Sequence, residues 1–173
     1  MPFDAAVIAA HAAAIPASPW FGLVGLPFSD QERATMARLA PRAVRVPSWG
    51  DARRIADDAR ANAAYDADTA EVVELKARAL RAVAPDTLQQ ALSEVVDGGL
   101  EVFFRSAGTA ARRARFDDET TVRAAAGSAA EAVYRGALAA AVAGPGHRFT
   151  RVEALFASGR WPLARIADTL YVF

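Results

Sequence analysis

The chain has 173 residues, and its 20 Lys and Arg side chains balance 20 Asp and Glu side chains. A neutral chain has no overall field that attracts nucleic acid or an anionic membrane, so we expect neither as a partner. The sequence has no cysteine, which excludes disulfides, thiolate nucleophiles and cysteine-ligated zinc. The length favours one globular domain over residues 1–173.

The first residues predict a short helix followed by a loop. Asp4 can cap a helix that runs to about Ala14. Repeated Pro and Gly residues between 15 and 28 prevent a regular helix there. Asp4 also stands where a signal peptide carries Lys or Arg, and no segment reaches the roughly 18 apolar residues needed to cross a bilayer. We therefore expect a cytoplasmic protein.

Helix starts are well marked in the middle of the chain. Ser29 and Glu32 have the spacing of a capping box, which opens a helix that ends before Pro41. Apolar residues recur at helical spacing after this and the other starts. The same spacing predicts four further starts, at Ser48 to Asp51, Asp68 to Glu71, Asp86 to Gln89 and Thr150 to Glu153.

The pair Gly98 and Gly99 predicts a break in one of these helices. The apolar run Leu100–Phe104 that follows fits either a helix or a short strand. Glu101 and Arg105 stand at i and i+4, the spacing of an ion pair on a helix surface, and this favours the helix.

The last third of the chain predicts two helices and a hairpin. A long helix over 118–143 ends at the sequence Gly144-Pro145-Gly146. A last helix over 150–158 follows, and Pro162 prevents its continuation. The apolar residues on either side of Asp168-Thr169 predict a small β-hairpin.

These elements together predict a mainly α protein, a single-domain helical bundle with a small C-terminal β-hairpin. Abundant alanine fits this fold, because alanine favours helices. The predicted parts are a short helix and loop over 1–28, a helical body over 29–158 and a C-terminal hairpin over 159–173.

No group of residues has the pattern of a catalytic or metal site. His11 and His147 have no carboxylate or second histidine at ligand spacing. The acidic pairs Asp57-Asp58 and Asp117-Asp118 fit a solvated face and a helix cap better than a metal site, because adjacent helix residues point about 100° apart. The basic run Arg112–Arg115 is followed by acids and fits an internally paired cluster. We therefore predict no catalytic residue, cofactor or metal ion.

One region is locally acidic although the whole chain is neutral. The segment from Asp51 to Glu74 carries more acidic than basic side chains. This excess fits either an ordinary helix surface or a docking face for a basic protein. On the second interpretation the contact residues are Asp57, Asp58, Asp66, Asp68, Glu71 and Glu74.

The closing residues carry a resemblance to known proteins. Gly159-Arg160-Trp161-Pro162-Leu163, a short turn and Leu170-Tyr171-Val172-Phe173 resemble the ending of small bacterial immunity proteins of contact-dependent inhibition and polymorphic toxin systems. Such proteins often have Gly after the Pro-Leu pair, where this chain has Ala164. The resemblance implies a non-enzymatic protein that binds a cognate toxin domain and blocks it. Trp161 is then either a core anchor or a contact to the partner.

Two other classes of protein stay open at the level of the sequence. An enzyme or a small-ligand binder would have an interhelical pocket lined by aromatic side chains. A structural domain would bury its C-terminal strand in a second copy, so the oligomeric state is open. The aromatic residues considered for the pocket are Trp20, Phe21, Trp49 and Trp161.

Overall fold

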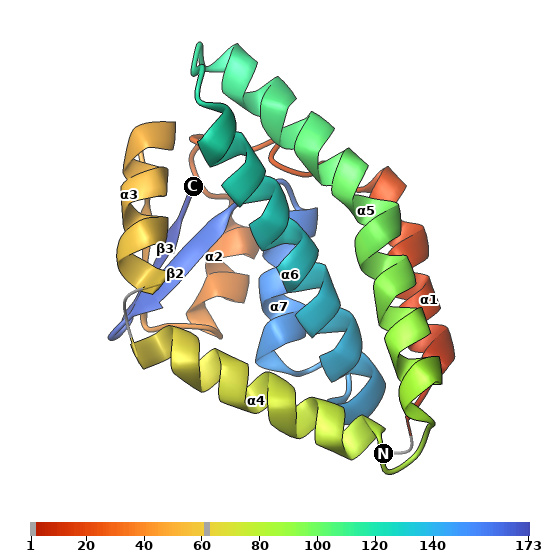
Figure 1. The fold of residues 1–173 in the computed structure, drawn as a ribbon. Coiled ribbons are helices and arrows are strands. Elements are labelled where there is room, and N and C mark those ends of the chain that lie inside the picture. Colours follow the sequence, from red (N-terminus) through yellow and green to blue (C-terminus); the bar gives the residue numbers. More distant parts are fainter. Residues whose placement is uncertain (1–2, 61–62) are drawn as a thin grey trace.

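Helices make up most of the fold, and a small sheet forms beside them (Figure 1). The computed structural model describes residues 3–60 and 63–173 and, within these, the side chains outside 60–66. The predicted mainly α fold is confirmed. The elements are α1 (Ala5–Ala14), a 3₁₀ turn η1 (Ile15–Ala17), α2 (Asp30–Ala37), β1 (Arg42–Arg45), α3 (Trp49–Arg60), α4 (Ala63–Ala79), α5 (Pro85–Arg113), α6 (Glu119–Ala143), α7 (Arg148–Ala157), β2 (Pro162–Ile166) and β3 (Thr169–Val172).

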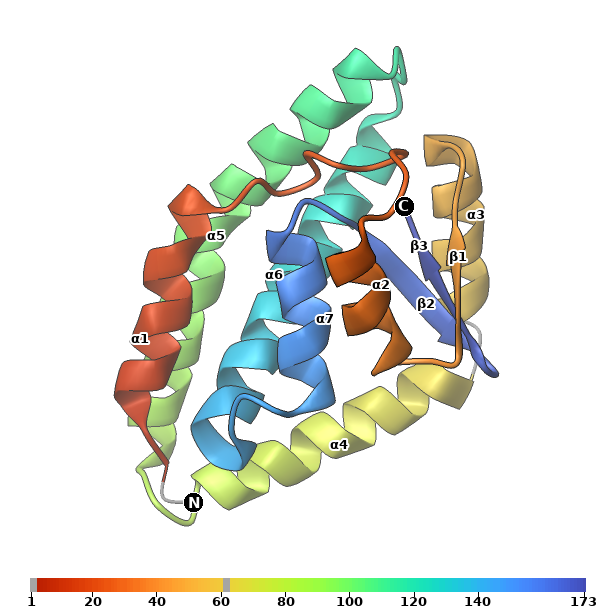
Figure 2. The ribbon, with the colours of Figure 1, turned by 180° about the vertical axis from the view of Figure 1, so that it is seen from behind.

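Two long antiparallel helices, α5 and α6, form the centre of the helical part (Figure 1). α1 lies along α5, and Figure 2 shows α7 on the other side of α6 with α2 beside it. Small side chains fill the contacts of α6, where Ala125, Ala129 and Ala137 are fully buried. Small side chains let helix backbones approach closely, which explains how an alanine-rich chain packs.

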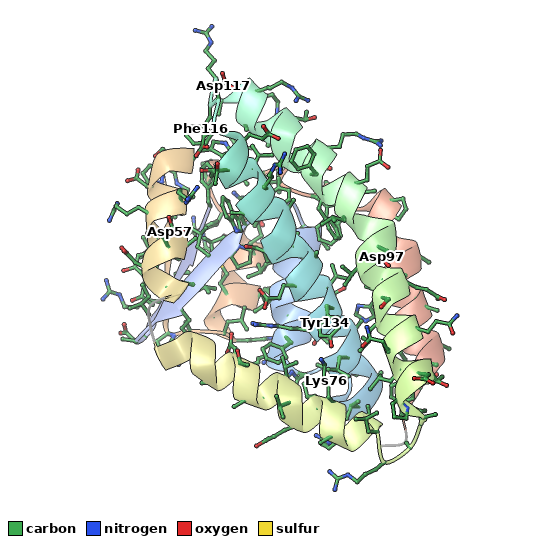
Figure 3. All side chains as sticks on the ribbon, viewed as in Figure 1. Asp57, Lys76, Asp97, Phe116, Asp117 and Tyr134 are labelled. Carbon is green, nitrogen blue, oxygen red and sulfur yellow. The ribbon has the colours of Figure 1, made fainter. Side chains whose placement is uncertain are left out.

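α4 crosses the end of the bundle and connects α3 to α5 (Figure 1). Lys76 of α4 lies over the ring of Tyr134 of α6, with the ammonium nitrogen 5.2 Å from the ring centre (Figure 3). Arg78 donates a hydrogen bond to the Val142 carbonyl at 3.1 Å. Polar contacts from Lys76 and Arg78 therefore attach the C-terminal end of α4 to α6.

Three predicted helix starts are confirmed by their hydrogen bonds. Asp4 accepts the N–H of Ala6 at 2.9 Å, and Asp118 accepts the N–H of Thr120 at 3.0 Å. The third is the complete capping box at the start of α2. In that box the Ser29 N–H donates to the Glu32 carboxylate at 2.6 Å, and the Glu32 N–H donates to the Ser29 hydroxyl at 3.3 Å.

The predicted start of the last helix is wrong by two residues. α7 begins at Arg148, and His147 caps it, because its Nδ1 accepts the N–H of Phe149 at 3.2 Å. The Thr150 hydroxyl donates to the His147 carbonyl at 2.6 Å instead of capping a helix. Glu153, the other half of the predicted capping box, turns toward α1.

Two other predicted starts are displaced, and one more is confirmed. Asp68 lies inside α4 rather than at its beginning. α5 begins at Pro85, which suits a first helical position because it has no N–H to leave unpaired. The predicted start at Ser48 is confirmed, since its hydroxyl accepts the N–H of Asp51 at 3.1 Å.

The predicted helix break at Gly98 and Gly99 is wrong. α5 continues through both glycines, and Leu100–Phe104 is helical. Gly98 has open space around it, whereas a Cβ on Gly99 would lie 2.6 Å from Cε2 of Phe103 and 2.9 Å from Cδ1 of Ile15. At Gly99, α5 therefore packs closely against Ile15 of the N-terminal segment.

The predicted C-terminal hairpin is confirmed, and it belongs to a three-stranded sheet with the order β1-β3-β2. Ala167 and Asp168 join β2 to β3, so the turn lies one residue earlier than predicted. Ala167 has a φ of 53°, a left-handed conformation that suits a two-residue hairpin turn. The central strand β3 is parallel to β1 and antiparallel to β2.

β1 was not predicted from the sequence. All four of its residues, Arg42–Arg45, are exposed. An exposed strand has no alternation of apolar and polar side chains, which is the pattern that predicts strands. Its partner β3 lies at the far end of the chain, so tertiary structure rather than local sequence creates this strand.

The C-terminal residues lie in the core. Phe173 packs edge-on against Trp49 with ring centres 5.3 Å apart, and Trp161 lies 5.7 Å from Trp49. Trp161 is only 1% exposed. This burial assigns Trp161 to the core and leaves it no surface for the partner contact considered above.

Candidate functional site

A groove of about 780 Å³ runs beside the C-terminal hairpin. α3, α4, α6, α7 and β2 all contribute to its walls. Figure 1 shows the ribbons of β2, α6 and α4, which carry three of these walls. We call this groove the hairpin groove, because residues 162–167 line it along the whole of β2 and into the turn.

The wall opposite β2 is a stretch of α6 with small side chains. Ala124, Gly127, Ser128 and Ala132 line the groove there. A Cβ added to Gly127 would have no heavy atom within 4 Å. The groove therefore owes its width on this side to small residues.

Apolar side chains form much of the rest of the surface. Phe149, Phe156 and Leu170 line the groove from positions that are otherwise buried. The half-buried side chains that line it are Val152, Leu163 and Ile166. A ligand in the groove would remove this apolar area from water, which favours binding.

Ion pairs form the α4 end of the groove. Asp68 accepts hydrogen bonds from Arg135 at 3.3 Å and from Arg148 at 2.5 Å. Arg135 also pairs with Glu131, one turn earlier on α6, at 2.6 Å. The carboxylates that line the groove are therefore already neutralised by neighbouring guanidinium groups.

Glu71 extends this network to the start of α7. Arg148 donates to Glu71 from Nε at 2.6 Å, and His147 Nε2 lies 2.9 Å from the same carboxylate. Because His147 Nδ1 accepts the N–H of Phe149, a neutral ring carries its proton on Nε2 and donates it to Glu71. Burial opposes the charged form of Arg148, but its hydrogen bonds to Glu71 and Asp68 outweigh burial and raise its pKa.

Two further arginines line the groove without such a partner. Arg38 follows α2, Arg165 lies in β2, and both are exposed. Arg165 donates from Nε to the Ala167 carbonyl at 3.3 Å. Among the described side chains no carboxylate lies within ion-pair distance of either guanidinium. Among the described side chains that line it, the groove therefore carries more positive than negative charge.

The acidic residues predicted for docking do not form one free surface. Asp57, which Figure 3 labels on α3, pairs with Arg53 of the same helix at 2.6 Å. Asp58 and Glu74 are exposed on α3 and α4, respectively, and the side chain of Asp66 lies outside the described residues. The other two predicted residues are Asp68 and Glu71 of α4, which pair with arginines at the groove.

A second histidine–carboxylate pair lies on the far side of the bundle. His11 Nδ1 of α1 is 2.6 Å from Glu153 Oε1 of α7. Burial raises the pKa of Glu153, although the hydrogen bond from His11 opposes this shift. Sequence spacing did not predict this pair or the contact of His147 with Glu71, because each partner comes from a distant helix. Within residues 3–60 and 63–173 no group of three or more His, Cys, Asp or Glu side chains could hold a metal ion.

The aromatic residues considered for an interhelical pocket lie in the core. Trp20 packs edge-on against Phe103 with ring centres 4.6 Å apart, and Trp49 stacks on Phe116 at 5.8 Å. Trp49 also borders a second hollow of about 630 Å³. The hairpin groove is thus formed by other residues than Trp20, Phe21, Trp49 and Trp161, all of which are buried.

Comparisons with known proteins find no matching family model, no similar curated protein and no similar solved structure. No helix among the described residues is both long and apolar enough to cross a membrane. The geometry of the hairpin groove therefore carries the functional assignment.

Proposed function

We propose that this chain is a non-enzymatic binding protein of the immunity type, which neutralises a bacterial toxin domain by forming a direct complex with it. The observation that carries the proposal is the position of the C-terminal hairpin. Among the residues that resemble the ending of immunity proteins, Pro162, Leu163 and Leu170 line the hairpin groove. The sequence resemblance and a surface shaped for binding thus coincide.

The groove is held in shape without a partner. Trp161 and Phe173, which precede β2 and follow β3, exchange backbone hydrogen bonds of 2.7 and 2.9 Å. The α4 wall is fixed by the ion pairs of Asp68 and Glu71 with Arg148. Walls that are fixed beforehand lose less conformational entropy on association, which supports tight binding of a protein partner.

Growth rescue tests the proposed function. The protein encoded by the gene next to that of this chain, which the proposal expects to contain the toxin domain, is expressed in a bacterial host, alone and together with the chain. We expect the chain to restore growth and to co-purify with the toxin domain. A host that still fails to grow while it contains the folded chain, with no complex recovered, would contradict the proposal.

The same groove favours a second candidate function, the binding of a small amphipathic acid. Its volume of about 780 Å³ falls within the range of roughly 300–1,000 Å³ of small-molecule sites. Apolar side chains such as Val152 and Leu163 line it together with Arg38 and Arg165. Octanoate and phenylpropionate are suitable probes, and we expect them to raise the melting temperature of the chain. Unchanged melting at saturating probe would exclude this candidate.

A further inference from the structure

β2 is an edge strand, and its free side opens into the hairpin groove. The strand order β1-β3-β2 leaves one side of β2 unpaired, and consecutive residues from 162 to 167 line the groove. Successive side chains of a strand point to opposite faces of the sheet. Because residues that point to both faces of the sheet line the groove, its course fits the unpaired edge of β2.

The hairpin geometry identifies the free backbone groups. Ile166 and Thr169 close the two-residue turn, and Arg165 stands opposite Leu170. Hydrogen-bonded and non-hydrogen-bonded pairs alternate in an antiparallel ladder, so Arg165 turns its N–H and C=O away from β3. Pro162 at the start of β2 fits the same arrangement, since proline is confined to edge strands and strand ends.

The α6 wall of the groove carries short side chains around an exposed glycine. Gly127 of α6 is exposed, and a Cβ there would meet no atom within 4 Å. Ala124 and Ser128 flank it on the same wall. A segment that pairs with β2 would therefore lie between the strand edge and a helix face with short side chains.

The charges of the groove define the chemistry of its occupant. Asp68 and Glu131 are already paired with arginines, while Arg38 and Arg165 have no carboxylate partner among the side chains that the structure describes. Positive charge therefore remains for a ligand, and an acidic segment complements it. The half-buried apolar side chains along the same groove fit apolar residues between the acidic ones.

We propose that the hairpin groove binds an extended, acidic segment of the protein partner, which pairs with β2 as a fourth strand of the sheet. This inference rests on the immunity-type function proposed above and specifies the part of the partner that is recognised. Carboxylates of the segment face Arg38 and Arg165, and its backbone pairs with that of Arg165. From the sequence alone, the acidic segment 51–74 fits either an ordinary helix surface or a docking face for a basic protein, and Asp68 and Glu71 of that segment are paired internally.

A selection from displayed peptides tests this inference without the toxin domain. A pool of random peptides of about seven residues, the length of a typical strand, is selected on the intact chain. We expect the enriched peptides to combine Asp or Glu with apolar residues. We also expect hydrogen exchange at the Arg165 amide to slow when such a peptide binds. A pool that enriches basic peptides, or no peptides, would overturn the inference.

Two glycine variants locate the binding site. Gly127→Phe fills the groove from the α6 wall, and Gly98→Phe places the same side chain at an exposed position of α5 that also has open space. We expect the enriched peptides to bind Gly127→Phe about tenfold more weakly or worse, equivalent to about 1.4 kcal/mol, and Gly98→Phe as they bind the wild type. Circular dichroism confirms that both variants are folded. An equal affinity for both variants would overturn the inference.

Two arginine variants test the charge. Arg165→Glu should weaken binding of the acidic peptides, whereas Arg81→Glu, at an exposed position between α4 and α5, should not. Loss of binding in both variants would show a general charge effect and overturn the inference. Growth rescue without groove-dependent peptide binding overturns this inference alone. Peptide binding without growth rescue overturns the immunity-type function and leaves the specificity of the groove in place.

Discussion

The Arg160 guanidinium and the Glu32 carboxylate form a buried ion pair, with Nε 2.5 Å from Oε1. Arg160 is 1% exposed and Glu32 8%. A second N–H of the guanidinium donates to Glu32 Oε2 at 3.1 Å, and three others donate to the carbonyls of Leu23, Leu26 and Pro27. The pair therefore joins the N-terminal loop and the first turn of α2 to the segment that leads into β2, and so supports one wall of the groove.

Replacement of Arg160 by methionine is expected to destabilise the fold severely. Arg160→Met leaves the Glu32 carboxylate buried without a counter-charge, which costs about 3–5 kcal/mol. Urea unfolding followed by circular dichroism measures the loss. The matched control is Arg123→Met, because Arg123 forms an exposed pair with Glu119 that is worth less than about 1 kcal/mol. Equal losses in the two variants would contradict the role given to Arg160.

The same ion pair makes stability fall in acid. The hydrogen bond from Arg160 outweighs the effect of burial and lowers the pKa of Glu32 from 4.5 to about 2. A carboxyl group whose pKa is lowered by folding stabilises the fold above its unfolded pKa, and this stabilisation is lost as the pH falls through the folded value. Between pH 4.5 and 2 we expect the wild type to lose roughly 3 kcal/mol more than Glu32→Gln. Unfolding free energies with the same pH dependence in both proteins would contradict this.

Two glycines of α6 are expected to respond in opposite ways to alanine. Gly127→Ala should raise the free energy of unfolding by up to about 1 kcal/mol, because its Cβ meets no atom and alanine is the better helix former. Gly136→Ala places a Cβ 2.0 Å from Oε2 of Glu153 and should cost about 1–3 kcal/mol. Thermal unfolding measures both. Adding Glu153→Ala to Gly136→Ala should recover part of the loss, and a loss that is unaffected by Glu153 would contradict the contact.

Arg148 is expected to control the attachment of α4. Arg148→Gln removes the hydrogen bonds to Asp68 and Glu71 that fix α4 beside α7. Amide hydrogen exchange in α4 should become faster, while exchange at the buried centre of α6 stays unchanged. Salt should reproduce part of the effect in the wild type, because these half-exposed pairs are screened. Unchanged exchange in α4 would show that apolar contacts alone hold this helix.

The sequence predicted the features that depend on neighbouring residues. The caps at Asp4, Ser29 and Asp118 are confirmed because each is made within a few residues of the same helix. The start of α7 was misplaced because its cap is His147, an imidazole in a position where Ser, Thr, Asp and Asn are usual. The predicted break at Gly98 and Gly99 was wrong because Gly99 leaves space for the side chains of Phe103 and the distant Ile15, and such a packing role is not visible in the local sequence.

The site depends on pairings that no local pattern contains. Asp68 and Glu71 were selected from the sequence for their charge, but their partners Arg135 and Arg148 lie 67 and 77 residues away along the chain, respectively. Because these pairings neutralise the carboxylates, the charged groups that line the groove without an ion-pair partner among the described side chains are the positive Arg38 and Arg165. The groove itself also lies between distant elements, β2 and α6, so its existence could not be inferred from the sequence of either one.

Growth rescue by the two glycine variants tests most directly whether the hairpin groove is the site at which a toxin domain is bound. Cells that express the toxin domain receive the wild-type chain, Gly127→Phe or Gly98→Phe at matched levels of folded protein. We expect the wild type and Gly98→Phe to restore growth and Gly127→Phe to fail. Rescue by Gly127→Phe as strong as that by Gly98→Phe would contradict the assignment of the groove as the binding site.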